Sequence, residues 1–302
     1  MIIKKEKQGD VTIYTVDKDY DDEKLRSKVS TFIKRDHIKY IIDHDADVYT
    51  ADGKLLIRFR KGVLPTTHVK LFYDNIIKFA KKVSKLRGNA SGGVALAQDK
   101  GVMSNIFGYF DNWTPSQKVI FRKKHVKPMV DVRECRFNQD YPEMYKQTIP
   151  LIQDIDHLYE KLTPEHYKLQ RRKANQTVFK IPNTSFTTIT TNVNNQTSIH
   201  TDKGDDEEGF GNLAVIEEGK YTGGETCFPQ YGIGIDVRTG DMLFMDVHQP
   251  HANLPIVKED KEAVRLSIVC YLRRNVWLKT KGKTRKFRDK HNMTMKKLRD
   301  KK

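Results

Sequence analysis

The sequence has little cysteine and no long apolar run. Its three cysteines, Cys135, Cys227 and Cys270, lack Cys-x-x-Cys spacing, so neither a disulfide framework nor a structural zinc site is indicated, and a reducing compartment is favoured. No stretch of about 18 apolar residues is present, which argues against a membrane span. The start, Met1-Ile-Ile-Lys-Lys, lacks the apolar segment of a signal peptide. We therefore expect an intracellular protein, nuclear or cytoplasmic, with no membrane partner.

Acidic residues are also in short supply. The chain has 39 Asp and Glu against 55 Lys and Arg, a net charge of +16. Most of the excess lies between Arg273 and Lys302, where fourteen basic residues face two Asp. Such a segment fits a polyanion, meaning DNA, RNA or an acidic membrane face, or else it is a solvated, partly disordered end. Trp277, Phe287 and Met293 interleave with the basic residues, as in a helix lying on DNA or a tail anchored to the core.

The first half of the 302 residues combines helical and strand patterns. Residues 11–16 alternate like a strand, and 48–59 resemble a hairpin that turns at Asp52-Gly53. Apolar residues recur at helical spacing in four segments, which we expect to be helices: 21–42, 69–86, 141–162 and 164–174. The run from Gly88 to Gly93 predicts a loop or hinge.

After Lys180 the pattern changes to short strands. They recur about every ten residues with glycine-rich turns between them, which is typical of a sandwich or jelly roll. The expected strands cover 185–192, 212–216, 224–228, 233–237, 241–247 and 264–272. With the helices before them, they predict an α+β protein whose helices buttress a β-barrel.

A possible metal site lies in this strand-rich half. His200 and Asp202 are two positions apart, and in an extended segment residues i and i+2 share a face. His251 follows at the end of another predicted strand. Two imidazoles and one carboxylate are the ligands of non-haem Fe(II) oxygenases. His248 competes with His251, but the segment 250–255, Pro-His-Ala-Asn-Leu-Pro, favours His251, and we expect His248 to pack or hydrogen-bond near the metal.

A second signal is an arginine inside an apolar strand. Arg265 and Ser267 alternate with Leu266 and Ile268, so the first two share a face. A guanidinium inside a barrel needs an anion. The C5 carboxylate of 2-oxoglutarate meets this need, with Ser267 adding a hydrogen bond. The alternative is a structural salt bridge with a carboxylate in the barrel such as Asp241 or Glu225.

These motifs carry a resemblance to a known family. Residues 179–273 resemble the oxygenase core of the Fe(II)/2-oxoglutarate dioxygenase superfamily, and within it the TET/JBP group of nucleic-acid base oxygenases, which includes viral and phage relatives. The resemblance rests on Asn192-Val-Asn194, His200-Thr-Asp-Lys-Gly-Asp205, Tyr221-Thr-Gly-Gly-Glu225, Phe228-Pro-Gln-Tyr-Gly232, Gly240-Asp241 and Asp246-Val-His-Gln-Pro-His251. Ala252 departs from the glycine that is common after the second histidine, and the cysteine-rich zinc modules of animal relatives are absent.

The resemblance implies a fold and a set of domains. The fold is a double-stranded β-helix (jelly-roll or cupin-like) oxygenase core with an N-terminal helical buttress. The domains would be an N-terminal α/β extension over 1–90, a dioxygenase domain over 91–277 with its core at 179–273, and a basic tail over 278–302. The gene could equally be virus-borne.

The resemblance also implies the site residues and cofactors. His200, Asp202 and His251 would bind Fe(II), and Arg265 would anchor 2-oxoglutarate. Asn192 and Asn194 would line the pocket of the co-substrate or the base. Ascorbate would serve as the reductant in vitro.

The expected reaction hydroxylates the methyl group of a DNA base, 5-methylcytosine or thymine, and releases succinate and carbon dioxide. The alternatives are a prolyl or lysyl hydroxylase with the same iron site, an RNA substrate, and a non-catalytic DNA-binding module. DNA phosphates would be bound by the tail, at Lys279, Lys281, Lys283, Arg285, Lys286 and Arg288. The sequence leaves the oligomeric state open.

Overall fold

The computed structural model describes residues 1–20, 22–85, 92 and 100–300. The chain forms two compact units, and the strands of the first unit come from three distant parts of the sequence. Unit 1 comprises residues 1–105, 190–203 and 210–269, and unit 2 comprises residues 106–189, 204–209 and 270–302. The units interleave along the chain, whereas the domains expected from sequence are contiguous. Helices and strands occur together, so the α+β class is confirmed.

The elements of unit 1 are β1 (Ile2–Gln8), β2 (Val11–Val16), α1 (Asp22–Ser27), η1 (Arg35–His37), β3 (Tyr40–Ile42), β4 (Ala46–Thr50), β5 (Leu55–Arg60), α2 (Thr66–Ala80), β9 (Gly211–Glu218), β10 (Tyr221–Gly223), β11 (Thr226–Phe228), η3 (Pro229–Tyr231), β12 (Ile233–Ile235), β13 (Met242–Met245), β14 (Ala252–Asn253) and β15 (Ile256–Lys258). Three strands pass from one unit into the other: β6 (Ser104–Phe110), β8 (Thr188–Val193) and β16 (Val264–Tyr271). Unit 2 contains α4 (Pro115–Lys123), β7 (Arg133–Glu134), α5 (Arg136–Asp140), α6 (Pro142–Leu162), α7 (Pro164–Ala174), α8 (Arg274–Thr280) and α9 (Arg285–Asp300).

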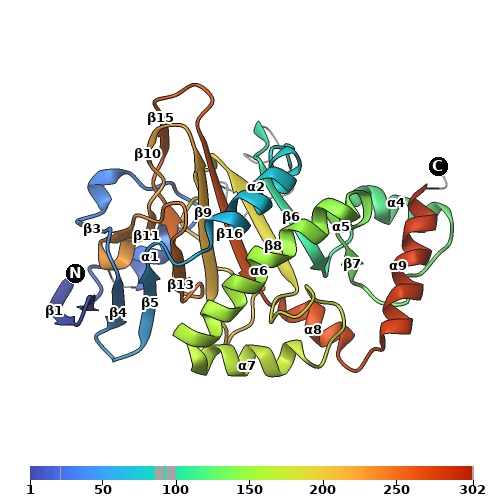
Figure 1. Ribbon diagram of the computed structural model, residues 1–302, viewed down its shortest axis with the longest axis horizontal. Coiled ribbons are helices and arrows are strands. Elements are labelled where there is room, and N and C mark those ends of the chain that lie inside the picture. Colours follow the sequence, from blue (N-terminus) through green and yellow to red (C-terminus); the bar gives the residue numbers. More distant parts are fainter. Residues whose placement is uncertain (21, 86–91, 93–99, 301–302) are drawn as a thin grey trace. The chain divides into compact units, whose positions relative to one another are not determined.

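The sheets of unit 1 hold its core. The large sheet has the strand order β1-β2-β4-β5-β13-β9-β16-β8-β6, a smaller sheet has the order β14-β11-β12-β3, and β10 pairs with β15 (Figure 1). Alternation in β2 buries Thr12, Tyr14 and Val16 and leaves the residues between them half-buried. The strand predicted at 11–16 and the hairpin predicted at 48–59 are confirmed, and Gly53 turns the hairpin at φ 80°.

The long helix expected at 21–42 is wrong beyond its first turns. The chain leaves α1 after Ser27, and Ser30 has a left-handed φ of 69°, which a helix does not tolerate. Residues 40–42 instead form β3, which pairs in parallel with β12. The apolar spacing therefore reflected separate packing sites: Ile33 is buried, while Val29 and Phe32 are exposed.

The other predicted helices are present. Those expected at 69–86, 141–162 and 164–174 correspond to α2, α6 and α7. The expected strands after Lys180 correspond to β8, β9, β11, β12, β13 and β16. The loop predicted at 88–93 lies outside the described residues, apart from Gly92. None of the described helices is both long and apolar enough to cross a membrane.

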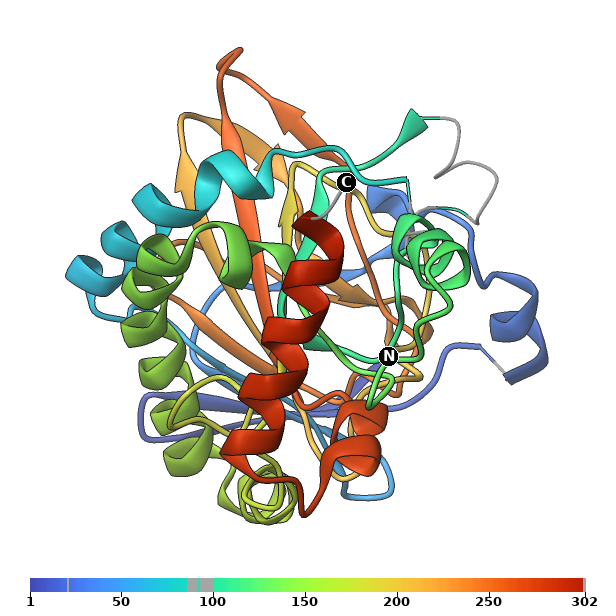
Figure 2. The same ribbon diagram turned by 90° about the vertical axis from the view of Figure 1, so that its right-hand side faces the viewer.

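Unit 2 ends in two helices rather than in an irregular tail. Figure 2 shows α8 in orange-red and α9 in red at the end of the chain. Val276 of α8 packs in a buried cluster with Tyr109, Val132 and Phe179, and Phe287 of α9 packs against the same cluster. The basic C-terminal segment is therefore folded into unit 2, and its aromatic residues supply part of the packing.

Candidate metal centre and co-substrate site

His200 and His251 lie opposite each other in a short antiparallel bridge of unit 1. The amide of His200 donates to the carbonyl of His251 at 3.0 Å, and the reverse bond measures 2.9 Å. Two positions on, the amide of Asp202 donates to the carbonyl of Val247 at 3.0 Å. Backbone pairing thus brings together two segments that lie 51 positions apart in the sequence, and both histidines come to one place.

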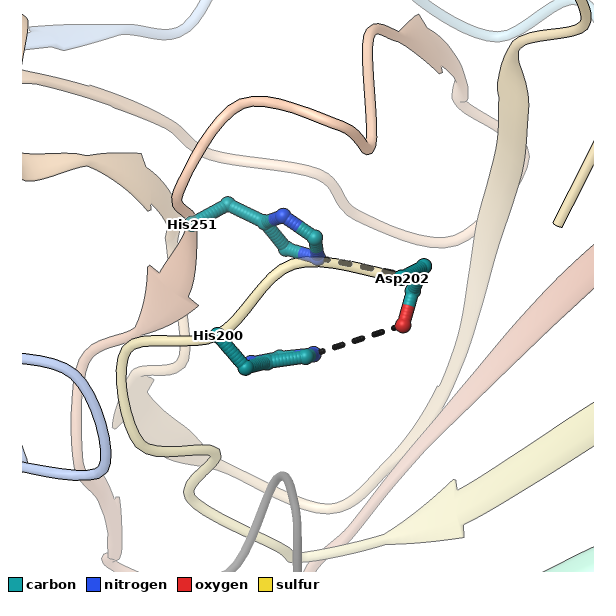
Figure 3. Close-up of side chains that lie close together, drawn as sticks. All are labelled: His200, Asp202 and His251. Atoms are coloured by element: carbon teal, nitrogen blue, oxygen red, sulfur yellow. Dashed lines mark ion pairs between the residues drawn. The ribbon is translucent and has the colours of Figure 1, made fainter. Parts of the chain in front are cut away.

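The three side chains converge on a common point. Asp202 Oδ1 lies 3.8 Å from His200 Nε2, and Asp202 Oδ2 lies 3.8 Å from His251 Nε2 (Figure 3). All three ligand atoms lie within 4.8 Å of one another. Among the described residues, this is the group of histidine, cysteine and acidic side chains whose geometry can hold a metal ion. His251, rather than His248, is the second histidine of the group.

The protonation state of both rings follows from their other nitrogen. His200 Nδ1 lies 2.7 Å from the carbonyl oxygen of Ser198, and His251 Nδ1 lies 2.9 Å from that of Gln249. A carbonyl can only accept, so Nδ1 carries the proton in each ring. The lone pair of each neutral imidazole is then on Nε2, which faces Asp202. Hydrogen bonds of this kind fix the orientation of metal-binding histidines.

Burial keeps His251 in the neutral form. Its side chain is 5% exposed. Burial and, to a smaller extent, the neighbouring His200 lower the pKa of His251 to about 4, against the opposing effect of Asp202. The two rings lie 4.4 Å apart between centroids, so a charge on one disfavours a charge on the other. A metal ion therefore finds His251 already deprotonated near neutral pH.

The donor set fits Fe(II). Ligand distances of about 2.0–2.2 Å allow two ligands of one ion to lie up to about 4.4 Å apart, and the 3.8 Å separations fall within that limit. Two imidazoles and one carboxylate leave positions open on an octahedral ion, as in the facial triad of non-haem iron oxygenases. A closed structural zinc site uses four protein ligands instead.

His248 is held apart from this cluster. Its Nδ1 lies 3.2 Å from Asp246 Oδ1, and its backbone amide donates to the same oxygen at 3.0 Å. These bonds tie the ring to the turn that leads to His251. A role of His248 beside the metal stays a prediction.

Arg265 of β16 is a buried cation that makes no ion pair among the described residues, although the negative charges of Glu217 and Glu225 act on it from a greater distance. Its side chain is 5% exposed, and burial lowers the pKa of the guanidinium. Across the described residues it forms no ion pair with Asp241 or Glu225. Asp241 instead accepts from the amides of Gly62 and Arg238, both at 2.9 Å. A buried, unpaired charge is costly, so this position is suited to an anionic ligand.

Gly224 and Tyr221 lie beside Arg265, and sequence reasoning gave neither a role. A Cβ atom on Gly224 would lie 2.7 Å from both Cδ and Nε of Arg265, so only glycine leaves room for the guanidinium. Tyr221 is buried, which raises the pKa of its phenol, while the charge of Arg265 opposes that rise. The segment Tyr221-Thr-Gly-Gly-Glu225 was visible in the sequence, but its contact with Arg265 requires the fold.

Of the polar residues predicted around the co-substrate, Asn192 and Ser267 contact each other, whereas Asn194 contacts the backbone of β16. Asn192 Nδ2 donates to Ser267 Oγ at 3.2 Å, so these two lie together on adjacent strands. Asn194 has a left-handed φ of 47° and uses its side chain on the backbone of β16: Nδ2 donates to Ala263 and Oδ1 accepts from the Arg265 amide at 2.7 Å. The side chain of Asn194 therefore positions Arg265.

Asn253 also positions the site, although it was not predicted. Its Oδ1 accepts from the amide and the hydroxyl of Thr197, each at 2.7 Å. Its Nδ2 donates to Asn195 and Leu254 carbonyls. These bonds hold the segment before His200 against the segment after His251.

In unit 2, four of the six basic residues predicted to bind nucleic acid are engaged within the unit. Lys279 donates to two backbone carbonyls, Lys281 lies over Trp277, Lys283 lies over Phe287, and Arg288 bonds Asp289 and Val178. Arg285 and Lys286 are exposed.

The fold and the triad define a class of protein, a mononuclear non-haem iron enzyme. Residues 119–274, slightly more than half of the chain, match the Tet_JBP family model, the oxygenase domain of the 2OGFeDO superfamily. The chain therefore belongs to the TET/JBP family of Fe(II)- and 2-oxoglutarate-dependent dioxygenases, as the motifs had suggested.

Individual relatives agree with this assignment. The chain is 33% identical over 199 residues to the bifunctional helicase and thymine dioxygenase JBP2 of Leishmania braziliensis, which covers 66% of this chain and 16% of that protein. It is 27% identical over 259 residues to the thymine dioxygenase JBP1 of Trypanosoma brucei brucei, which covers 83% of this chain and 28% of that protein. The chain thus spans about a sixth to a quarter of the length of these relatives.

A solved structure shares the fold. NgTET1 in complex with 5mC DNA matches with a TM-score of 0.54 and 13% sequence identity, over 86% of this chain and 94% of that chain.

Proposed function

We propose that this protein hydroxylates the methyl group of a DNA base, thymine or 5-methylcytosine, with Fe(II) and 2-oxoglutarate. The observation that carries the proposal is the convergence of His200, Asp202 and His251, in a chain of the TET/JBP family. The similarity to thymine dioxygenases makes thymine the first base to test. In this proposal the two sheets of unit 1 form the double-stranded β-helix of such oxygenases.

Each side chain receives a role from its position. His200 Nε2, His251 Nε2 and an oxygen of Asp202 would hold the iron. Arg265 would bind the distal carboxylate of 2-oxoglutarate in a bidentate manner, because its guanidinium is buried and unpaired among the described residues. Ser267, which accepts a hydrogen bond from Asn192, would donate its own hydroxyl hydrogen to the same carboxylate.

In the proposed reaction, the two atoms of dioxygen are divided between two products, as in other Fe(II)- and 2-oxoglutarate-dependent dioxygenases. When bound, Fe(II) and 2-oxoglutarate together supply activation of dioxygen. One oxygen atom enters the methyl C–H bond to give a hydroxymethyl base, and the other enters succinate as 2-oxoglutarate loses carbon dioxide. The residues of the chain contribute position and exclusion of water.

A base inside a duplex must leave the stack to reach a buried site. Extrusion costs a few kcal/mol, which contacts inside the pocket offset. Aromatic side chains are suited to stack on an extruded base. Tyr109 and Phe210 are each 5% exposed and belong to the packing of their own units, whereas Phe110 is half-buried.

The decisive experiment is mass spectrometry of nucleosides after DNA containing thymine and 5-methylcytosine is incubated with the protein, Fe(II), 2-oxoglutarate and ascorbate. We expect a hydroxymethyl base, with succinate formed in equal amount. His200→Ala and Asp202→Ala should abolish both products, while His166→Ala, on α7 of unit 2, should retain them. Succinate formed without any altered base would reject DNA as the substrate. Unchanged succinate formation in both site variants would reject the iron site.

A further inference from the structure

Helix α9 has an inner and an outer face. Phe287, His291 and Met295 are spaced four residues apart and form the inner face. His291 is fully buried, and its Nε2 lies 2.7 Å from the carbonyl oxygen of Val132. Phe287 packs edge-on against Phe179 at 6.5 Å between centroids. These contacts fix α9 within unit 2, with the opposite side of the helix turned to solvent (Figure 2).

The outer face of α9, defined by Lys286, Lys290, Lys296 and Lys297, is a row of cations, in which Lys296 lies near enough to Glu134 and Asp300 to act on their charge. All four side chains are exposed. Within the part of the chain that the structure describes, none of them makes a hydrogen bond or an ion pair. The two acids of the helix are already used by its arginines: Asp289 pairs with Arg288, and Asp300 pairs with Arg299.

Lys297 lies in the last turn of α9, where a cation interacts favourably with the helix dipole, but the charges of Lys286 and Lys290 do not serve the stability of the helix. Like charges four residues apart, as at Lys286 and Lys290, destabilise a helix by a few tenths of a kcal/mol. Packing of the inner face holds the helix in place instead. Exposed positive charge that forms no ion pair among the described residues indicates an external anionic partner.

We propose that the outer face of α9 binds the phosphate backbone of duplex DNA. The proposal rests on the proposed function, which makes DNA the substrate. The twelve residues from Lys286 to Lys297 span about 16 Å, from eleven rises of about 1.5 Å, and phosphates of one DNA strand advance about 3.4 Å per base. The row therefore faces about five successive phosphates. Contacts of this kind hold the duplex without reading its sequence.

The surroundings of the row favour DNA over a lipid surface. A helix that lies on a membrane turns a broad apolar face outward. The apolar residues of α9 face inward, and Met293, 53% exposed, is the large apolar side chain that reaches solvent on this helix. Met293 lies with Lys296, Lys297 and Asp300 around a shallow hollow of about 330 Å³. Met293 could contact a deoxyribose there, with the two lysines beside the adjoining phosphates and Asp300 paired with Arg299.

The proposal predicts the salt dependence of binding. The variant Lys286→Gln, Lys290→Gln, Lys296→Gln and Lys297→Gln removes four charges. Each lysine that contacts a phosphate contributes about one unit to the slope of log K against log salt concentration. We expect the slope to fall by about 3 to 4 units, and the Kd for a short methylated duplex to rise at least about tenfold at ~0.1 M salt.

A matched control removes four exposed lysines of unit 1, Lys7, Lys78, Lys81 and Lys220, by the same substitution. It carries the same net charge as the α9 variant and should keep a slope within about one unit of the unmodified protein. Equal losses in both variants, or an unchanged slope in the α9 variant, would overturn the proposal. So would loss of binding to anionic phospholipid vesicles with no change in DNA binding.

The binding experiment on the α9 variant and the test of base oxidation can succeed or fail separately. If the unmodified protein forms no hydroxymethyl base but the α9 variant loses DNA affinity, the proposed function fails and the α9 surface stands. If the base is oxidised but the α9 variant keeps its salt slope, the surface fails and the proposed function stands. Both variants should melt close to the temperature of the unmodified protein, because the substituted side chains are exposed and make no hydrogen bond or ion pair among the described residues.

Discussion

At the scale of single residues, Arg265 is the group whose setting the fold has arranged most tightly. Asn194 holds its backbone amide, Tyr221 lies near its charge, and Gly224 leaves the space that the side chain fills. Each of these neighbours acts on the position of the guanidinium. The role of Arg265 as an anion anchor can therefore be tested without removing Arg265.

The substitution Gly224→Ala should weaken binding of 2-oxoglutarate. The added methyl group meets Cδ and Nε of Arg265 at 2.7 Å, so the guanidinium must move. We expect the KM for 2-oxoglutarate, measured by succinate formation, to rise about tenfold or more, since a shift of ~1.4 kcal/mol is tenfold. Gly53→Ala is the control, because Gly53 has a similar φ of 80° but no atom within 4 Å. Equal effects of both substitutions on KM would show that backbone strain alone is responsible.

At the scale of elements, α9 is attached through a buried histidine. Burial lowers the pKa of His291 below the ordinary value of 6.5. The hydrogen bond to Val132 and the negative charge of Asp131 only partly oppose this effect. Its ring is stacked on Phe287 and lies near Trp113. Protonation would place a charge among these aromatic residues, so the attachment of α9 should weaken in acid.

The sign of this effect follows from proton uptake. Because the pKa of His291 is lower in the folded protein, the unfolded chain binds more protons below about pH 6.5, and stability falls as pH falls. The contribution is at most about 1.4 kcal/mol per pH unit. Denaturant unfolding of the protein and of His291→Gln at pH 7.5 and 5.5 measures it. We expect the variant to lose less stability between the two pH values; identical losses would contradict the assignment.

At the scale of the whole molecule, the proposed metal site of His200, Asp202 and His251 exists only in the folded chain. A metal ion that binds there favours the folded state. A divalent metal should therefore raise the stability of the protein, by about 2.7 kcal/mol at a hundredfold excess over Kd. Anaerobic unfolding with Fe(II) or Mn(II), against a chelator, tests this. Asp202→Ala should lose the increase, while Glu262→Ala, which removes an exposed carboxylate, should keep it. Equal metal stabilisation in all three proteins would place the metal elsewhere.

Sequence reasoning was most successful where spacing is local. The i, i+2 relation of His200 and Asp202 and the alternation that buries Arg265 with Ser267 both follow from strand geometry. It failed at 21–42, where the buried apolar residues belong to two separate core clusters, Ile33 and Ile38 to one and Ile42 to the other. Periodicity cannot separate these cases, because burial of Ile38 and Ile42 depends on partners far along the chain.

The sequence alone determined which family the chain resembles, because two histidines, one aspartate and one arginine stand in its motifs, and that family implies Fe(II) and 2-oxoglutarate. Only the tertiary structure decided which histidine joins the triad, through the backbone bridge between His200 and His251. It also decided which lysines remain free for a partner, since an inner and an outer face of α9 exist only once the helix is packed. Contacts between distant segments are the physical reason in both cases.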